Sequence, residues 1–166
     1  RYRGFINTLA DADGTLRRMP LVIAHGGTLH PSLALATALR ARGLDRAVVG
    51  RDEDGPYVEV GATRMPVDAR GNTLLRFNGG SQHYPALSAK DLLRGAVDPR
   101  ALSGKVVFVG SSAAGLNDVH VAAVDRVFPG LKVQAAMAEN LLTGRVLAVP
   151  SWSSAFILAA CVLTGA

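Results

Sequence analysis

The sequence predicts an α/β (mixed α+β) domain. Antiparallel hairpins and two or three packed helices surround a mixed sheet, and the start of a transmembrane helix follows. Three observations predict this: strand-like runs separated by Asp-Gly turns, two segments with helical spacing, and an uncharged C-terminal run. Of the 166 residues, 49% are hydrophobic and 19% are charged, which is typical of a globular domain with a core of its own.

Strand-like runs come in pairs joined by turn residues. Residues 4–23 hold two such runs separated by DADG, so we expect a β-hairpin there. Residues 47–60 predict a strand, an acidic turn at 52–56 and a second strand. Residues 62–80 predict another hairpin, which turns near residues 68–71.

Three segments favour helices. Residues 31–43 begin with proline in the first turn and end at a glycine, with Leu35 and Leu39 one turn apart on a buried face. Residues 88–95 begin with a Ser-x-x-Asp pattern similar to a capping box and also end at glycine. Residues 131–143 place Val133, Ala136, Met137, Asn140 and Leu141 at i, i+3, i+4, i+7 and i+8, a helical spacing, before Gly144.

The most informative stretch is residues 105–118, KVVFVGSSAAGLND. After Lys105 it continues with four apolar residues, three of them β-branched, so we expect a buried strand over 105–109, followed by a loop over 110–128. Open α/β sheets bind ligands at the C-terminal ends of their strands. The candidate ligand-binding residues are Ser111, Ser112, Asn117 and Asp118 of this loop, together with Asn78 and Arg17.

Catalytic motifs fit this loop poorly. A nucleophile elbow requires glycine at positions held by Val109 and Ala113, and His120 lies only two residues from Asp118. The loop also lacks the Lys-Ser/Thr ending of a P-loop and the glycine spacing of a dinucleotide site. A small α/β hydrolase or nucleotide-binding enzyme that uses residues 110–118 therefore stays only as the alternative. Hydroxyls that tie a turn to backbone amides are the simpler interpretation.

The sequence predicts neither a metal nor a cofactor. Asp11, Asp13 and Gly14 resemble the start of a calcium loop, but the further oxygen ligands are missing, which favours a β-turn. The four histidines lack zinc-ligand spacing. Arg17 and Arg18 alternate across a strand, so we expect one to hold a carboxylate inside the domain and the other to be solvated.

The charge pattern does not favour nucleic acid. The net charge of +5 comes mainly from scattered arginines, without the clustering and interleaved aromatics of nucleic-acid binders. The single cysteine, Cys161, excludes an intramolecular disulfide. The chain begins with Arg1, without a visible signal peptide, so we expect it to be part of a longer protein.

The C-terminal residues 146–166 contain no charged residue, and the last of them turn continuously apolar. Such a run is typical of a transmembrane helix, which needs about 20 apolar residues, and Trp152 would lie at the membrane interface. A C-terminal core helix of a soluble protein is the alternative. It is less favoured because the run has no polar stripe.

Taken in order, residues 4–150 resemble a known family. The segments that carry the resemblance are DADGTLRRMPL, LSGKVVFVG and PGLKVQAAMAENLLTG, and a hydrophobic span follows them. They are similar to CHASE type 2 domains, the cyclase/histidine-kinase-associated sensing extracellular domains. The resemblance supplies no catalytic residue.

The resemblance implies an extracytoplasmic (periplasmic) sensory domain over residues 1–150 and the beginning of a transmembrane helix over 151–166. The whole protein would then be a bacterial membrane receptor with a cyclase or kinase output, in which this segment is not an enzyme. The implied partners are an unknown small-molecule or protein signal, the membrane and a second copy in a homodimer. Helix 131–143 and residues 145–150 would carry the signal to the membrane. An N-terminal part of the family's fold is expected before Arg1.

Overall fold

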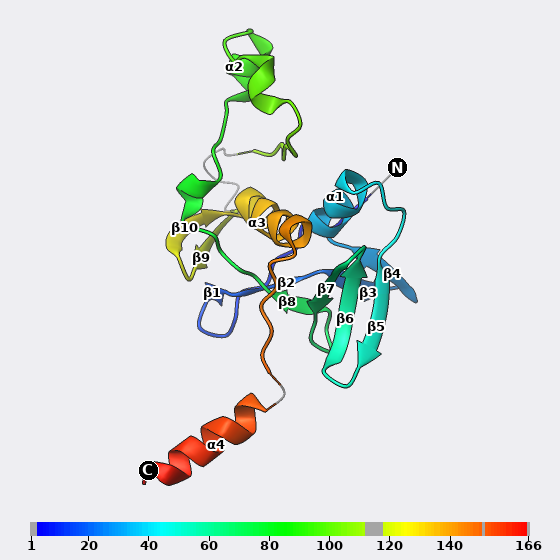
Figure 1. Cartoon of the computed structure of the whole chain (residues 1–166). Coiled ribbons are helices and arrows are strands. Elements are labelled where there is room, and N and C mark those ends of the chain that lie inside the picture. Colours follow the sequence, from blue (N-terminus) through cyan, green and yellow to red (C-terminus); the bar gives the residue numbers. More distant parts are fainter. Residues whose placement is uncertain (1–2, 112–117, 151, 166) are drawn as a thin grey trace.

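The computed structural model describes residues 3–111, 118–150 and 152–165. Two helices, α1 (Leu33–Ala41) and α3 (Gly130–Thr143), lie against four small sheets, as Figure 1 shows. The mixed α+β class predicted from the sequence is confirmed. Two segments stand out from this body, one around α2 (Ala89–Leu93) and the other at α4 (Ser153–Leu163).

The strands are short and pair across distant parts of the chain. One sheet has the order β5-β6-β7, a second β1-β9-β10, and two strand pairs are β2-β8 and β3-β4. The bounds are β1 Thr15–Leu16, β2 Arg18–Pro20, β3 Val22–His25, β4 Thr28–Pro31, β5 Val48–Asp52, β6 Gly55–Val60, β7 Thr63–Pro66, β8 Asn72–Leu74, β9 Val119–Ala122 and β10 Asp125–Pro129. Two 3₁₀ helices complete the list, η1 (Ser81–His83) and η2 (Pro99–Leu102).

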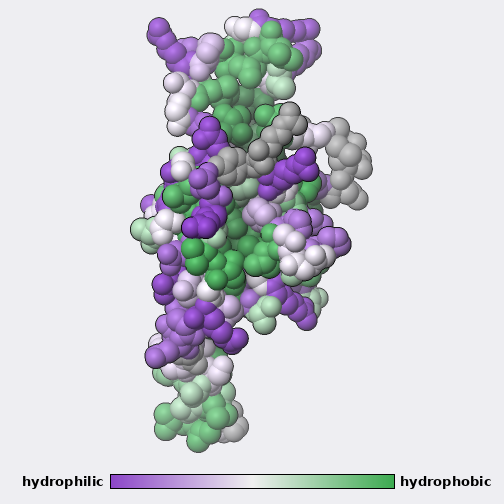
Figure 2. All heavy atoms as spheres, turned by 90° about the vertical axis from the view of Figure 1, so that its right-hand side faces the viewer, coloured by the Kyte–Doolittle hydropathy of each residue, from purple (hydrophilic) through white to green (hydrophobic). Residues whose placement is uncertain are grey.

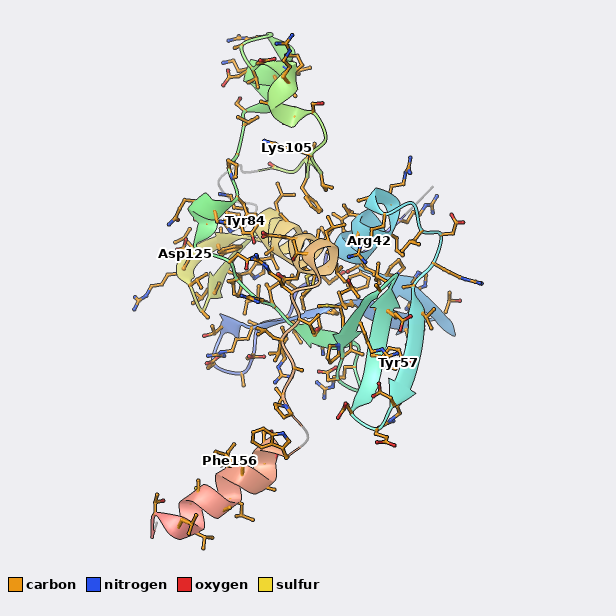
Figure 3. All side chains as sticks on the ribbon, viewed as in Figure 1. Arg42, Tyr57, Tyr84, Lys105, Asp125 and Phe156 are labelled. Atoms are coloured by element: carbon orange, nitrogen blue, oxygen red, sulfur yellow. The ribbon has the colours of Figure 1, made fainter. Side chains whose placement is uncertain are left out.

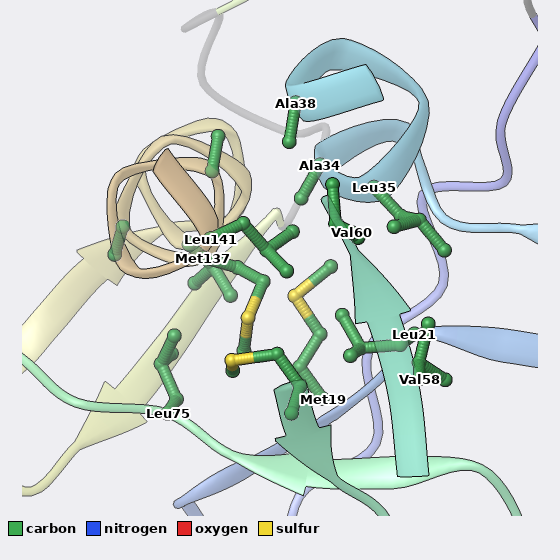
Figure 4. Packing of buried hydrophobic residues seen from close by; sticks show 14 of the residues in the cluster. Met19, Leu21, Ala34, Leu35, Ala38, Val58, Val60, Leu75, Met137 and Leu141 are labelled. Atoms are coloured by element: carbon green, nitrogen blue, oxygen red, sulfur yellow. The ribbon is translucent and has the colours of Figure 1, made fainter. Parts of the chain in front are cut away.

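The core lies between the helix pair and the strands below it. Figure 4 shows Met19, Met137 and Leu141 pointing into the same space, each with no exposed surface. Helix α1 contributes alanines and Leu35, so that it approaches α3 closely. Because methionine is flexible, it fills the irregular volume where strands of different sheets meet the helices.

The first predicted hairpin, over residues 4–23, is wrong. The turn itself forms, with the Gly14 amide donating to the Asp11 carbonyl at 2.8 Å. However, β1 pairs in parallel with β9, more than a hundred residues away. The run before the turn instead joins the entrance of α1, where the Phe5 amide donates to Pro31 at 3.1 Å. Tertiary packing thus overrides a local turn signal.

The next two hairpin predictions have different outcomes. Strands β5 and β6 pair as expected from residues 47–60. In residues 62–80 both strands and the turn at 68–71 form, but β7 pairs with β6 and β8 pairs with β2. The turn is stabilised by the Asp68 side chain, which accepts from the Asn72 amide at 2.9 Å. A turn therefore fixes a change of direction without fixing the partner strand.

The helices agree with the sequence more closely. In α1 the Ser32 side chain caps the first turn by accepting from the Leu35 amide at 3.2 Å, and Leu35 and Leu39 are buried. Helix α3 ends at Gly144, whose φ of 69° is the left-handed conformation expected there. In α2, Ser88 is the N-cap, but its side chain makes no capping hydrogen bond.

The predicted buried strand over residues 105–109 is also wrong. These residues are extended but belong to no sheet among the described residues, and all except Phe108 are exposed. The prediction of a loop over 110–128 is wrong from residue 119 onward, because β9 and β10 form an antiparallel hairpin there. Residues 105–109 have the composition of a central strand, but no strand among the described residues pairs with them.

Helix α4 is apolar and mostly exposed, as the lower end of Figure 2 shows. It begins beside an edge-to-face pair formed by Trp152 and Phe156, whose ring centroids lie 5.8 Å apart. Among the described residues, no helix is both long and apolar enough to cross a membrane.

Candidate functional site

The candidate residues from the sequence fall in separate places. Ser112 and Asn117 lie outside the described residues. Ser111 is exposed at the end of the extended segment that begins at Lys105. Asp118, Arg17 and Asn78 each belong to a different polar contact, so the structure does not gather them into one site.

Asp118 lies at the N-terminal end of α3. Its carbonyl accepts from the Gly130 amide at 2.9 Å, and its carboxylate covers the Cα of that glycine so closely that a Cβ would clash. A negative charge is favoured here because the first helical amides point outward. The His120 ring lies 3.5 Å from the carboxylate and 3.0 Å from the Thr8 hydroxyl. The Asp118 main chain thus satisfies the first amide of α3, without a side-chain capping hydrogen bond.

Arg17 holds the turn at residues 11–14 together. Its guanidinium donates to Asp13 at 2.7 Å and to Asp11 at 3.2 Å. The hydrogen bond from Arg17 holds the pKa of Asp13 well below its usual range, and that with Asp13 raises the pKa of Arg17. The expected carboxylate anchor is therefore Arg17, although it works at the surface and not inside the domain.

An open depression of about 690 Å³ lies beside Arg17. Thr15 and residues 121–126 of the β9–β10 hairpin form its other walls. The Asp125 carboxylate in this wall is already hydrogen bonded, since it accepts from the amides of Val127 and Ser81, each at 3.1 Å. These hydrogen bonds, the one from Val127 first, lower the pKa of Asp125. The depression is shallow, and of its described charged groups Arg17 and Asp125 are already paired, which leaves Arg126.

Asn78 belongs to a richer constellation, which we term the α3 polar cluster: Asn78, His83, Tyr84, Glu139 and Arg145. Its centre is Glu139, the only acidic residue of α3. The Tyr84 hydroxyl donates to Glu139 Oε2 at 2.7 Å, and His83 Nε2 lies 3.6 Å from Oε1. Arg145, just after α3, donates to the Asn78 side-chain oxygen at 3.3 Å. Residues 78–84 thereby meet both the middle of α3 and the segment that leaves it.

The electrostatics of the cluster keep Glu139 ionised. Its partial burial, which by itself would raise the pKa, is outweighed by the nearby Asn78 amide, the hydrogen bond from the Tyr84 hydroxyl and the His83 ring, so the pKa of Glu139 is lowered. Burial and the hydrogen bond to Glu139 both raise the pKa of Tyr84. The site therefore presents a negative carboxylate, held by a neutral phenol, at the edge of solvent.

The surroundings of the cluster hold it in place. The Tyr84 and Phe77 rings pack edge to face on buried Phe128, at centroid distances of 6.2 and 5.1 Å. Lys132 donates to the Ser81 carbonyl at 2.6 Å, which fixes η1 against the first turns of α3. Figure 3 shows Tyr84 pointing to α3 and Asp125 on the neighbouring hairpin. A ligand or a proton that reaches Glu139 thus acts on a rigid support.

Sequence reasoning included Asn78 but missed His83, Tyr84 and Glu139. The two parts of the cluster lie 55 to 67 residues apart in the sequence, so no spacing motif marks them. One signal was available, because Glu139 is the single carboxylate in a helix that otherwise shows an apolar pattern. A carboxylate there needs a partner, and that partner comes from the 3₁₀ turn at 81–83 and the residue after it.

Comparison with known proteins gives one match. The sequence model of the family described as the CHASE2 domain matches residues 1–166, the whole chain. No curated protein and no solved structure matches the chain. CHASE2 domains are extracellular sensory domains of signalling receptors and are not catalytic.

Proposed function

Because the chain belongs to the CHASE2 domain family, we propose that residues 1–150 are the periplasmic sensory domain of a bacterial transmembrane receptor and that residues 151–166 begin a membrane-spanning helix. The family match over the whole chain is the observation that carries this proposal. The signal then passes to a cyclase or kinase domain in the cytoplasm, and the receptor works as a homodimer.

The character of α4 supports an anchor in the membrane. Residues 146–166 carry no charge, and the aliphatic side chains of α4 are exposed all round the helix. An apolar surface of this kind is favourable in lipid and unfavourable in water. The Trp152–Phe156 pair at the start of α4 suits the interface between headgroups and hydrocarbon.

The α3 polar cluster supports a route for the signal. Glu139 lies in α3 and Arg145 directly follows the helix, and residues 145–150 lead from there toward α4. A small-molecule or protein signal that binds Glu139 or His83 competes with Tyr84 for the carboxylate. Loss of that contact loosens residues 78–84, including Asn78, from Arg145. A signal that prefers one arrangement shifts the population of the receptor toward it.

The alternative, a small hydrolase or nucleotide-binding enzyme that uses residues 110–118, has little support. The family is not catalytic. Of the three residues of this loop that the structure describes, Gly110 lies beside Leu131, Ser111 is exposed, and the Asp118 carbonyl accepts from the first amide of α3.

Cysteine labelling in intact cells tests the location. A Cys161→Ser background removes the native thiol, and Ser88→Cys places a new one on the exposed α2 segment. We expect a maleimide that cannot cross membranes to label Ser88→Cys in cells whose cytoplasmic membrane is intact. Labelling that occurs only after lysis would contradict the proposal. The Cys161→Ser background alone is the control and remains unlabelled.

A further inference from the structure

The facing side-chain atoms of His83 and Glu139 in the α3 polar cluster are too far apart for a hydrogen bond. His83 Nε2 lies 3.6 Å from Glu139 Oε1. Two ligand atoms on a tetrahedral zinc ion lie about 3.4 Å apart, because each bond from zinc to nitrogen or oxygen is about 2.0–2.1 Å long. A zinc ion between these two atoms therefore needs them to move together by only about 0.2 Å.

The two side chains also have the chemistry and the exposure that a zinc site needs. An imidazole nitrogen and a carboxylate oxygen are both ordinary zinc ligands, whereas magnesium and calcium favour oxygen ligands alone. The side chains of His83 and Glu139 are 43% and 29% exposed, so an ion from solvent reaches both. No group of three or more His, Cys, Asp or Glu side chains in the described part of the chain could hold a metal ion. Water therefore fills the remaining positions around the ion.

Tyr84 holds both side chains in this arrangement. Its hydroxyl donates to Glu139 Oε2 at 2.7 Å, the carboxylate oxygen that the ion does not need. The ring of His83 packs edge to face on that of Tyr84, with centroids 4.9 Å apart, and Tyr84 itself rests on Phe128. A hydrogen bond to a ligating carboxylate orients it and strengthens metal binding. The two ligands are thus positioned before an ion arrives.

Two cations near the cluster limit its affinity for zinc. Lys132 donates to the Ser81 carbonyl, and Arg145 donates to the Asn78 side-chain oxygen. Neither forms an ion pair with Glu139, but their charges oppose a further cation nearby. With two protein ligands and these neighbours, the site suits an ion that exchanges with solvent, and it differs from the closed four-ligand sites of structural zinc.

We propose that His83 and Glu139 bind a zinc ion at the surface of the α3 polar cluster, with Tyr84 as the residue that positions the carboxylate. The ion ties residues 78–84 to α3 through Oε1 of Glu139, while Tyr84 keeps its hydrogen bond to Oε2. Zinc therefore stabilises the arrangement that a signal competing with Tyr84 releases. This regulatory effect rests on the proposed function, whereas the zinc site itself does not.

Titration calorimetry with zinc, on the whole protein freed of metal by a chelator and carrying no polyhistidine tag, tests the site. Loss of an outer-shell hydrogen bond costs about 10- to 100-fold in metal affinity, so we expect Tyr84→Phe to weaken zinc binding about 10-fold. His83→Ala and Glu139→Gln each remove a ligand and should weaken it at least as much. His30→Ala, an exposed histidine on β4, is the matched control and leaves the affinity unchanged.

Three calorimetric results would contradict the proposal. The site does not exist if the wild type binds no zinc at concentrations up to the millimolar range. It lies elsewhere if His83→Ala and Glu139→Gln bind zinc as tightly as the wild type. An unchanged affinity in Tyr84→Phe would show that Tyr84 does not position the carboxylate.

Hydrogen–deuterium exchange locates the ion within the fold. The His83 and Tyr84 amides donate to the Gly80 and Ser81 carbonyls in η1, so their exchange reports on this turn. We expect zinc to slow their exchange about 10-fold in the wild type and not in His83→Ala, because the ion opposes local opening. Magnesium at the same concentration should have no effect, since it gains little from an imidazole. Equal slowing by magnesium, or by zinc in His83→Ala, would overturn the site.

Neither experiment depends on where the domain lies or on what it signals to. A failure of zinc binding therefore leaves the periplasmic location untouched. Maleimide labelling only after lysis would contradict that location and leave the zinc site standing.

Discussion

A hydrogen bond from the Arg42 side chain to the Leu141 carbonyl connects the C-terminal ends of α1 and α3. The Arg42 guanidinium, just after α1, donates to the Leu141 carbonyl at 2.9 Å and to the Leu142 carbonyl at 3.1 Å in the last turn of α3. It also donates to the Thr63 hydroxyl at 3.0 Å and to the Val60 carbonyl. Helix carbonyls in a last turn have no partner within the helix, and a cation there is favoured by the helix dipole. One side chain thus fastens α1, α3 and the β6–β7 turn.

We expect Arg42→Ala to lower the free energy of unfolding by about 2 kcal/mol, because hydrogen bonds to a charged group are lost and carbonyls lose their donor. Arg42→Lys should recover only part of this, since an ammonium group cannot span four acceptors in a plane. Urea denaturation followed by circular dichroism measures both. The exposed Arg46→Ala is the matched control. If its effect equals that of Arg42→Ala, Arg42 does not fasten α3.

Gln134 makes the corresponding link at the start of α1. It is buried in α3; its Oε1 accepts from the Ala34 amide at 3.1 Å and its Nε2 donates to the Ile6 carbonyl at 3.3 Å. We expect Gln134→Leu to destabilise the domain by about 1–3 kcal/mol, because a buried helix amide is left unpaired. The exposed Gln82→Leu controls for the change in polarity. Exchange of the Ala34 amide, measured by NMR, should accelerate only in the Gln134 variant.

The helices were predictable from sequence because their signals are local. The signals act within a few residues: Ser32 caps α1, Gly144 ends α3, and apolar residues recur at helical spacing within each helix. Strand pairing was not predictable, because β1 meets β9 and β8 meets β2 through packing between distant segments. The same reason hid the α3 polar cluster, in which Glu139 lies 55 residues from Tyr84.

Residues 105–109 show a different limit. Their apolar, β-branched composition predicted a buried strand, and the prediction is wrong because composition does not state which segments lie beside them. The family resemblance found from three motifs was confirmed over the whole chain. It established the class of function without indicating a site, because sensory domains bind diverse signals on a shared fold.

Two glycines with similar backbone conformations should respond differently to alanine. Gly71 has φ of 81°, and a Cβ there would clash with the Val22 carbonyl oxygen. Gly14 has φ of 78°, but a Cβ there meets nothing within 4 Å. We expect Gly14→Ala to cost about 1 kcal/mol for the left-handed backbone alone. Gly71→Ala should cost at least about 2 kcal/mol, because backbone overlap adds to it. Equal shifts in melting temperature would contradict the clash.

The α3 polar cluster makes stability depend on pH in a defined direction. The folded-state pKa of Glu139 is lowered, so its contribution is fully present above the pKa of a free glutamate, about 4.3, and is lost as the pH falls through the folded value. Between pH 7 and pH 3 we therefore expect Glu139→Gln to lose less stability than the wild type. Urea titrations at a series of pH values measure the difference.

Tyr84 gives the complementary test at high pH. Its folded-state pKa is raised, so its contribution is present below the pKa of a free tyrosine, about 10, and declines as the pH rises above it. Tyr84→Phe keeps the ring on Phe128 but removes the donor to Glu139, so it should raise the pKa of that carboxyl and flatten both ends of the pH profile. Tyr57→Phe, on β6 and remote from the cluster, is the control. If Tyr57→Phe changes the acid limb as much as Tyr84→Phe, the pH dependence does not arise from the phenol–carboxylate contact.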